Sequence, residues 1–72
     1  MDKNLKLLGE SIKKARTLLG ISQEELAFRS MLHRTYISSV ERGERNISFL
    51  NLIKIAKALE ISPSELIEGI IC

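Results

Sequence analysis

Residues 22–46 read SQEELAFRSMLHRTYISSVERGERN, and their pattern decides the fold expected for the chain. Ser22 and Glu25 have the spacing of a capping box, in which the serine hydroxyl accepts from the third amide of a helix and the glutamate reaches back. A helix is therefore expected to begin at Gln23 and to run into a tight turn around Met31.

A second short helix is predicted for residues 34–42, because Ile37 and Val40 are spaced to face a core together. Gly43 follows and suits the left-handed conformation that often ends a helix. The opposite face carries short polar side chains and arginines: Arg34, Thr35, Ser38, Ser39 and Arg42. Such a face lets a helix approach DNA base edges, and an arginine near its beginning can form paired hydrogen bonds with guanine. The same residues would also suit an ordinary solvent-exposed helix face.

The segments on either side of this pair also read as helices. Between residues 4 and 19, apolar residues recur every three or four positions, which predicts a helix that Gly20 ends. Ser48 is expected to cap a further helix that runs to Leu59, with Leu50 among its inward-facing apolar positions.

The last part of the chain carries another capping box. Ser62 and Glu65 form it around Pro63, which occupies the first helical position, so a fifth helix is expected to start there. No segment alternates with the period of a strand, and no linker or repeat interrupts the chain. The prediction is a single all-α domain, residues 1–72, folded as a compact five-helix bundle.

The composition excludes several classes of protein. The chain of 72 residues has one cysteine, Cys72, and one histidine, His33, so neither an internal disulfide nor a metal site is expected. The same residues leave no nucleophile and base for an enzyme, and no cofactor is expected. No apolar run is long enough for a membrane span and the first residues lack a signal-peptide core, so a cytoplasmic protein is expected. The net charge of +2 is compatible with nucleic-acid binding without indicating it.

Taken in order, the elements of residues 23–42 resemble the helix-turn-helix of the lambda-repressor/Cro family. The likeness rests on Ala27 in the first helix of the pair, on Ile37 and Val40 in the second, and on residues 41–43 at its end. It extends over nearly the whole chain. Residues 34–46, RTYISSVERGERN, are especially similar to the controller proteins of restriction–modification systems. The resemblance implies a DNA-binding transcription regulator with a lambda-repressor-like fold.

The resemblance also assigns roles to individual residues. Bases would be read by Arg34, Thr35, Ser38 and Ser39, and the DNA backbone would be contacted by Ser22, Gln23, Tyr36, Arg45 and Asn46. Gln23 would bind a phosphate together with the free amides at the start of its helix. Arg16 and Glu41 occupy positions that pair in the family, so an ion pair is expected to tie the first helix to the third.

Two residues depart from the family pattern. Met31 stands at the turn position usually filled by glycine, and because methionine disfavours positive φ, either a different turn or a strained one is expected. His33 stands where a serine, threonine or aspartate cap is expected, and histidine caps weakly. Neither departure should change the fold, but both bear on how the recognition helix sits in the DNA groove.

A homodimer is expected, because one motif helix covers only a few base pairs and specificity normally needs two copies on a palindromic operator. The predicted interface is the fifth helix and tail, residues 63–72, with help from the fourth helix. Its residues are Phe49, Asn51, Leu52, Leu66, Ile67, Ile70 and Ile71. The alternative is that the apolar residues of the fifth helix complete the monomer core. Cys72 is not expected to form an intersubunit disulfide in the cytosol.

As a regulator of the controller type, the protein would bind operators ahead of its own gene and the adjoining endonuclease gene. It would activate at low concentration and repress once a second dimer binds, and no small-molecule effector is expected. Activation would need a contact with RNA polymerase, to which Glu41, Glu44 or Glu60 cannot be assigned from the sequence. A phage-type repressor or an antitoxin would share the same DNA face, and a helical protein-interaction module would not bind DNA at all. These alternatives stay open at the level of the sequence.

Overall fold

The computed structural model describes the backbone of residues 2–71 and the side chains of residues 2–70. It contains five helices: α1 (Lys3–Leu19), α2 (Gln23–Ser30), α3 (Arg34–Glu41), α4 (Phe49–Ala58) and α5 (Pro63–Ile71). No strand occurs in this part of the chain. The all-α, five-helix fold expected from the sequence is confirmed, and the predicted boundaries differ from these by one residue at most.

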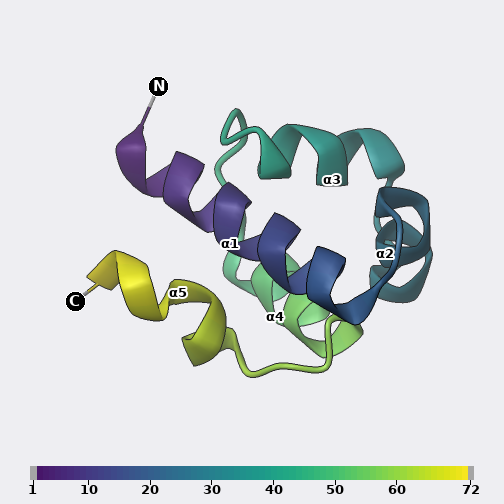
Figure 1. Cartoon of the computed structure of the whole chain (residues 1–72). Helices are drawn as coiled ribbons and strands as arrows, with labels where there is room; N and C mark the ends of the chain where they lie inside the picture. The colour runs from purple at the N-terminus through teal and green to yellow at the C-terminus, as the bar shows by residue number, and fades with distance from the viewer. Residues whose placement is uncertain (1, 72) are drawn as a thin grey trace.

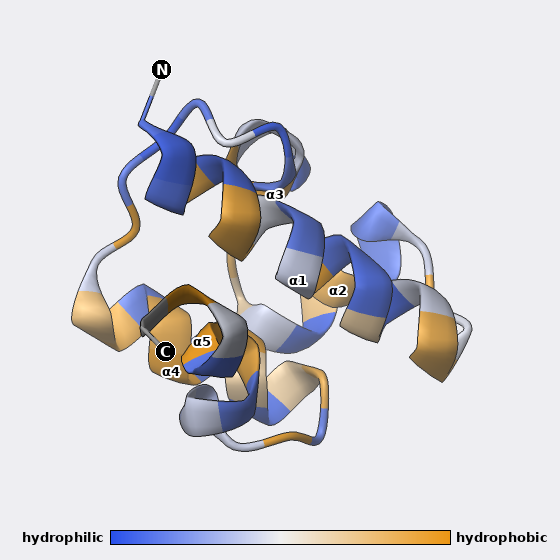
Figure 2. Ribbon diagram, turned by 60° about the vertical axis from the view of Figure 1, so that its left-hand side comes forward, coloured by the Kyte–Doolittle hydropathy of each residue, from blue (hydrophilic) through white to orange (hydrophobic). Residues whose placement is uncertain are grey.

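Helix α1 crosses the middle of the molecule, with α3 on one side and α5 on the other (Figure 1). It contacts both of them, while α2 contacts α3 and α4, and α4 also contacts α5. Figure 2 shows hydrophobic residues concentrated in α4 and α5, whereas α1 carries alternating hydrophilic and hydrophobic bands. This arrangement leaves the outer side of α3 uncovered by any other helix (Figure 1).

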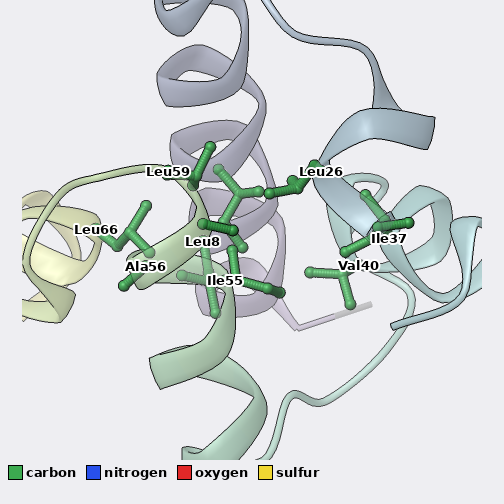
Figure 3. Close-up of a cluster of buried hydrophobic side chains, with 11 residues drawn as sticks. Leu8, Leu26, Ile37, Val40, Ile55, Ala56, Leu59 and Leu66 are labelled. Carbon is green, nitrogen blue, oxygen red and sulfur yellow. The ribbon is translucent and has the colours of Figure 1, made fainter. Parts of the chain in front are cut away.

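Each helix contributes one large side chain that solvent does not reach. These residues are Ile12, Leu26, Ile37, Ile55 and Leu66, each at most 1% exposed, and Figure 3 shows the cluster to which they belong. Burying one such side chain contributes about 1.5–3 kcal/mol, so the core depends on all five helices. The prediction that Leu66 lies in a dimer interface is therefore wrong, because its side chain completes the monomer core.

Helix α4 begins with two apolar residues that do not reach the core. Phe49 is 73% exposed and Leu50 is 69% exposed. The inward position predicted for Leu50 is wrong, because the rotation of α4 that buries Ile55 and Ala56 turns Leu50 to the opposite side of the helix.

Four of the helices end in the same way, beside a residue with positive φ. These residues are Gly20 (80°), Met31 (60°), Gly43 (75°) and Glu60 (63°). In each case the next amide donates to the carbonyl five positions back, as Leu32 does to Ala27 at 3.0 Å, which is the Schellman arrangement. Met31 therefore takes the strained left-handed conformation rather than a different turn.

Serines cap three of the helices, as predicted: Ser22 for α2, Ser48 for α4 and Ser62 for α5. At α5 the box is reciprocal, since the Glu65 carboxylate also accepts from the Ser62 amide at 3.2 Å. The return contact expected from Glu25 is not formed, because its carboxylate accepts from Arg29 Nε at 2.8 Å instead. His33 makes no side-chain capping bond at the start of α3.

Helices α1 and α3 come into backbone contact at Gly9. A Cβ at this position would lie 2.5 Å from the carbonyl oxygens of both Val40 and Glu41, and one at Gly43 would lie 2.7 Å from the Cα of Lys6. Both distances are shorter than van der Waals contact, so only glycine allows this approach. The carboxyl end of α3 is thereby held directly against the first half of α1.

Candidate nucleic-acid interface

Helix α3 presents a polar face to solvent and buries Ile37 on its other side. The four residues predicted to read bases share the polar face: Arg34 and Thr35 are exposed, and Ser38 and Ser39 are half-buried. Side chains three and four positions apart lie side by side on a helix. The structure therefore brings together on one surface the residues that the sequence indicated.

The two serines offer opposite hydrogen-bonding groups to a ligand. Ser39 Oγ donates to the Tyr36 carbonyl at 2.9 Å, which leaves its lone pairs free to accept. Ser38 Oγ accepts from Arg42 Nη1, which leaves its own proton free to donate. Since base edges in the major groove carry both acceptors and donors, this pair of hydroxyls matches the chemistry of such a surface.

Arg34 carries the free positive charge of this face. Among residues 2–70, its guanidinium takes part in no ion pair. Arg42, by contrast, is held by Glu44 at 3.0 Å. An unengaged guanidinium at the first residue of a helix retains the two parallel donors that a guanine or a phosphate accepts.

Tyr36 is held on two sides at the edge of α3. Its hydroxyl oxygen accepts from Asn51 Nδ2 at 3.1 Å, and the guanidinium of Arg45 lies over its ring, 5.4 Å from the centroid. Asn51, expected in a dimer interface, is half-buried and through this bond contacts α3 of its own chain. No motif in the sequence indicates this contact. Arg45 and Asn46, predicted to meet the DNA backbone, are exposed between α3 and α4.

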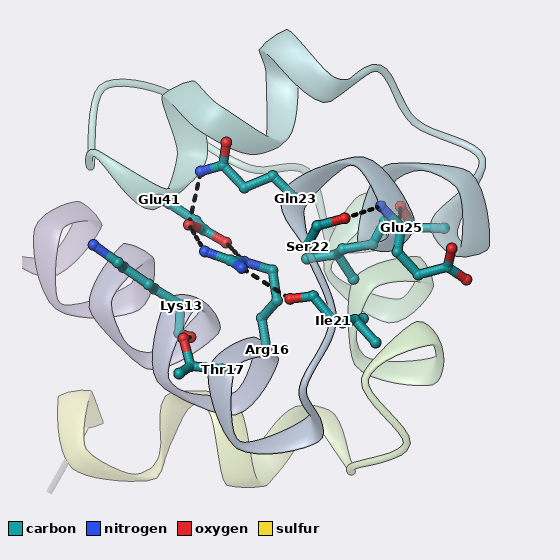
Figure 4. A network of polar contacts seen from close by, with 10 residues as sticks. Lys13, Arg16, Thr17, Ile21, Ser22, Gln23, Glu25 and Glu41 are labelled. Atoms are coloured by element: carbon teal, nitrogen blue, oxygen red, sulfur yellow. Dashed lines mark hydrogen bonds and ion pairs between the residues drawn. The ribbon is translucent and has the colours of Figure 1, made fainter.

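A buried ion pair joins α1 to α3, as predicted. Arg16 Nε lies 2.7 Å from Glu41 Oε2, and the two side chains are 13% and 3% exposed. Arg16 Nη2 donates to the other carboxylate oxygen at 3.1 Å, and Nη1 donates to the Ile21 carbonyl at 2.9 Å (Figure 4). The hydrogen bonds to Glu41 raise the pKa of Arg16 above its ordinary value, burial opposes the rise, and the Glu41 charge adds to it. Arg16 is therefore charged throughout the accessible pH range.

Gln23 joins this network from the start of α2. Its Nε2 donates to Glu41 Oε1 at 3.0 Å (Figure 4), so one carboxylate links α1, α2 and α3. The amide has a second N–H, which this bond leaves available for a phosphate. Ser22 likewise keeps its hydroxyl proton, because its oxygen only accepts in the helix cap.

The acidic residues considered for a polymerase contact differ in availability. Glu41 is excluded by its burial in the ion pair. Glu44 is engaged by Arg42 at 3.0 Å. Glu60 is the most exposed of the three, with its side chain 67% exposed and 3.6 Å from Arg29.

The residues predicted for dimer formation are only partly available on the surface. Phe49 is 73% exposed, whereas Leu52, Ile67 and Ile70 are half-buried against the core. The side chain of Ile71 lies outside the described residues. Among the side chains described up to residue 70, the most exposed apolar ones of this region are therefore at the start of α4.

Two general features bear on the class of site. Within the part of the chain that the structure describes, no group of three His, Cys, Asp or Glu side chains is placed to hold a metal ion. None of the described helices is long and apolar enough to cross a membrane.

The fold and its polar recognition helix define the class of protein: the chain belongs to the helix-turn-helix family, which residues 12–66 match. Among its relatives is control protein C.BamHI of Bacillus amyloliquefaciens, which is 47% identical over 70 residues, 94% of this chain and 86% of that protein. The restriction-modification controller protein C.AhdI from Aeromonas hydrophila has a crystal structure with a TM-score of 0.89 and 48% identity, over 90% of this chain and 98% of that one.

A third relative has been solved on DNA. The controller protein C.Esp1396I, 40% identical with a TM-score of 0.87 over 96% of this chain and 91% of that one, forms a tetramer in complex with its natural 35 base-pair operator. The resemblance to controller proteins seen in the sequence is thus confirmed over most of the chain. The family consists of transcription regulators and not of enzymes.

Proposed function

We propose that this protein is a sequence-specific DNA-binding transcription regulator that controls restriction–modification genes, its own among them. The observation that carries the proposal is the polar face of α3, where the uncommitted guanidinium of Arg34 lies beside the free donor of Ser38 and the free acceptor of Ser39. The operator complex of a relative with 40% identity supports it.

In this function α3 lies in the major groove, and Arg34 contacts guanine through two hydrogen bonds. Thr35, Ser38 and Ser39 follow along the same face and read the neighbouring base edges. Gln23 and Arg45 contact phosphates on either side and fix the register of the helix, without reading sequence themselves.

Specific binding requires two copies of this short helix. A homodimer presents them about one helical turn of DNA apart on a palindromic operator, as repressors of this motif class do. Filling of one operator activates transcription through RNA polymerase, and filling of a neighbouring operator at higher concentration represses it. The site of action is the DNA in the bacterial cytoplasm.

The test is a gel-shift titration with the DNA upstream of the gene and with a scrambled duplex, each at two salt concentrations. Arg34→Ala should abolish the preference for the operator, at a cost of about 1–3 kcal/mol. Arg45→Ala should weaken binding to both duplexes and reduce the salt slope by about one. The exposed Lys57 on α4 supplies the control, Lys57→Ala, which should bind as the parent does. Equal binding to both duplexes, unaffected by Arg34→Ala, would contradict the proposal.

A further inference from the structure

The contact between Tyr36 and Asn51 has a direction that leaves one group unused. The Asn51 Nδ2 can only donate, so the Tyr36 oxygen accepts at 3.1 Å and the phenol proton is not consumed. Within residues 2–70, that proton has no acceptor. The Tyr36 hydroxyl is therefore held in place by Asn51 while its proton stays free to be donated.

The position of the ring is set from three directions. The backbone of Tyr36 is part of α3, Asn51 holds the hydroxyl, and the Arg45 guanidinium covers one face of the ring. Asn51 is itself anchored, because its backbone amide donates to the Ser48 cap at 3.1 Å. The first turn of α4 thus acts as a fixed support for a residue of the recognition helix.

We propose that Asn51 is a positioning residue for DNA binding, which holds the Tyr36 hydroxyl so that its free proton is donated to a DNA phosphate oxygen. This inference rests on the proposed function. A phosphate oxygen only accepts, which complements the free phenol proton, and the Arg45 cation beside the ring attracts the same anion. A hydroxyl that accepts one hydrogen bond also becomes a stronger donor in the next. Asn51 thereby strengthens the contact as well as placing it.

The test is a double-mutant cycle in operator binding, measured by fluorescence anisotropy of labelled DNA. Asn51→Ala and Tyr36→Phe should each weaken binding about three- to tenfold, the usual net value of a hydrogen bond. The double variant should bind no more weakly than Tyr36→Phe alone, because Asn51 acts through the hydroxyl that this variant lacks. Asn4→Ala changes an exposed asparagine on α1 and should leave binding unchanged.

A second measurement needs no DNA. The chain has one tyrosine and no tryptophan, so its intrinsic emission reports on Tyr36 alone. The polarisation of this emission should fall in Asn51→Ala, because the ring loses its anchor, and stay unchanged in Asn4→Ala. Circular dichroism verifies that each variant is folded.

The outcomes separate the two proposals. Parent protein that binds operator and scrambled DNA equally would contradict the proposed function, whatever Asn51 does. Operator binding that is unaffected by Asn51→Ala, or weakened by the same factor in the Tyr36→Phe background, would overturn the positioning role. Unchanged emission polarisation in Asn51→Ala would overturn it as well. A weaker dimer in Asn51→Ala, measured by sedimentation, would explain the loss of binding through the dimer interface and overturn the positioning role.

Discussion

Arg16 and Glu41 lie on different helices, 25 residues apart in the chain, and are joined by two hydrogen bonds of 2.7 and 3.1 Å. A third donor, the Gln23 amide, reaches the same carboxylate at 3.0 Å, and the Arg16 guanidinium also holds the Ile21 carbonyl. The Glu41 carboxylate thus joins α3 to both α1 and α2, and Arg16 also holds the segment between α1 and α2.

Replacing Glu41 with glutamine should lower the free energy of unfolding by about 3 kcal/mol or more, because the Arg16 charge then lacks its partner in a largely buried site. Urea denaturation followed by circular dichroism measures this loss. Arg29→Gln breaks the more exposed pair with Glu25 and should cost less than about 1 kcal/mol. Similar losses in both variants would contradict the expectation that the buried pair stabilises the fold more than the exposed pair does.

The ionisation of Arg16 should add no pH dependence to the free energy of unfolding near neutral pH. Its pKa is raised in the folded state, so its stabilising contribution is complete below the ordinary arginine pKa. That contribution is lost only as the pH rises through the raised value, at strongly alkaline pH.

Gly9→Ala should destabilise the protein although alanine is the better helix former. The added Cβ would lie 2.5 Å from the Val40 and Glu41 carbonyl oxygens, so α1 and α3 would have to separate. Gly69→Ala on α5 is the matched control, since nothing lies within 4 Å of its Cβ position. It should stabilise the helix by up to about 1 kcal/mol. Thermal unfolding of the two variants should therefore shift in opposite directions, and parallel shifts would reject the close contact.

Met31→Gly should stabilise the protein by about 0.5–1 kcal/mol, because it relieves the left-handed strain of a non-glycine residue. Met31 is 81% exposed, so little packing is lost. Glu24→Gly, on the exposed side of α2, should instead destabilise by about 1 kcal/mol. Chemical denaturation measures the change in the free energy of unfolding for each variant. A loss of stability in Met31→Gly would show that the methionine side chain stabilises the protein by more than the left-handed conformation costs.

Phe49→Ser should weaken dimer formation about tenfold or more if the start of α4 forms the centre of the interface. Phe28→Ser is a close control, because Phe28 is 80% exposed and Phe49 is 73% exposed, but Phe28 lies on α2. Sedimentation equilibrium of both variants compares their dimer dissociation constants. Dimers that tolerate Phe49→Ser as well as Phe28→Ser would remove α4 from the predicted interface.

The helix boundaries were predictable because their signals are local. Ser48 accepts from an amide three residues away, and Gly20 supplies a left-handed conformation that most residues avoid. The orientation of Leu50 was not predictable, because an apolar residue on an amphipathic helix faces whichever side its neighbours cover. Glu60, a second non-glycine residue with positive φ, gave no signal in the sequence.

The sequence by itself determined the five helices, the polar face of α3 and, through the family resemblance, the partnership of Arg16 and Glu41. These depend on contacts within one helical turn or on motif positions. Only the tertiary structure decided that Leu66 belongs to the core and that Asn51 holds Tyr36. The physical reason is that such contacts exist only once helices from distant parts of the chain have packed, and packing is set by the shape of the whole core.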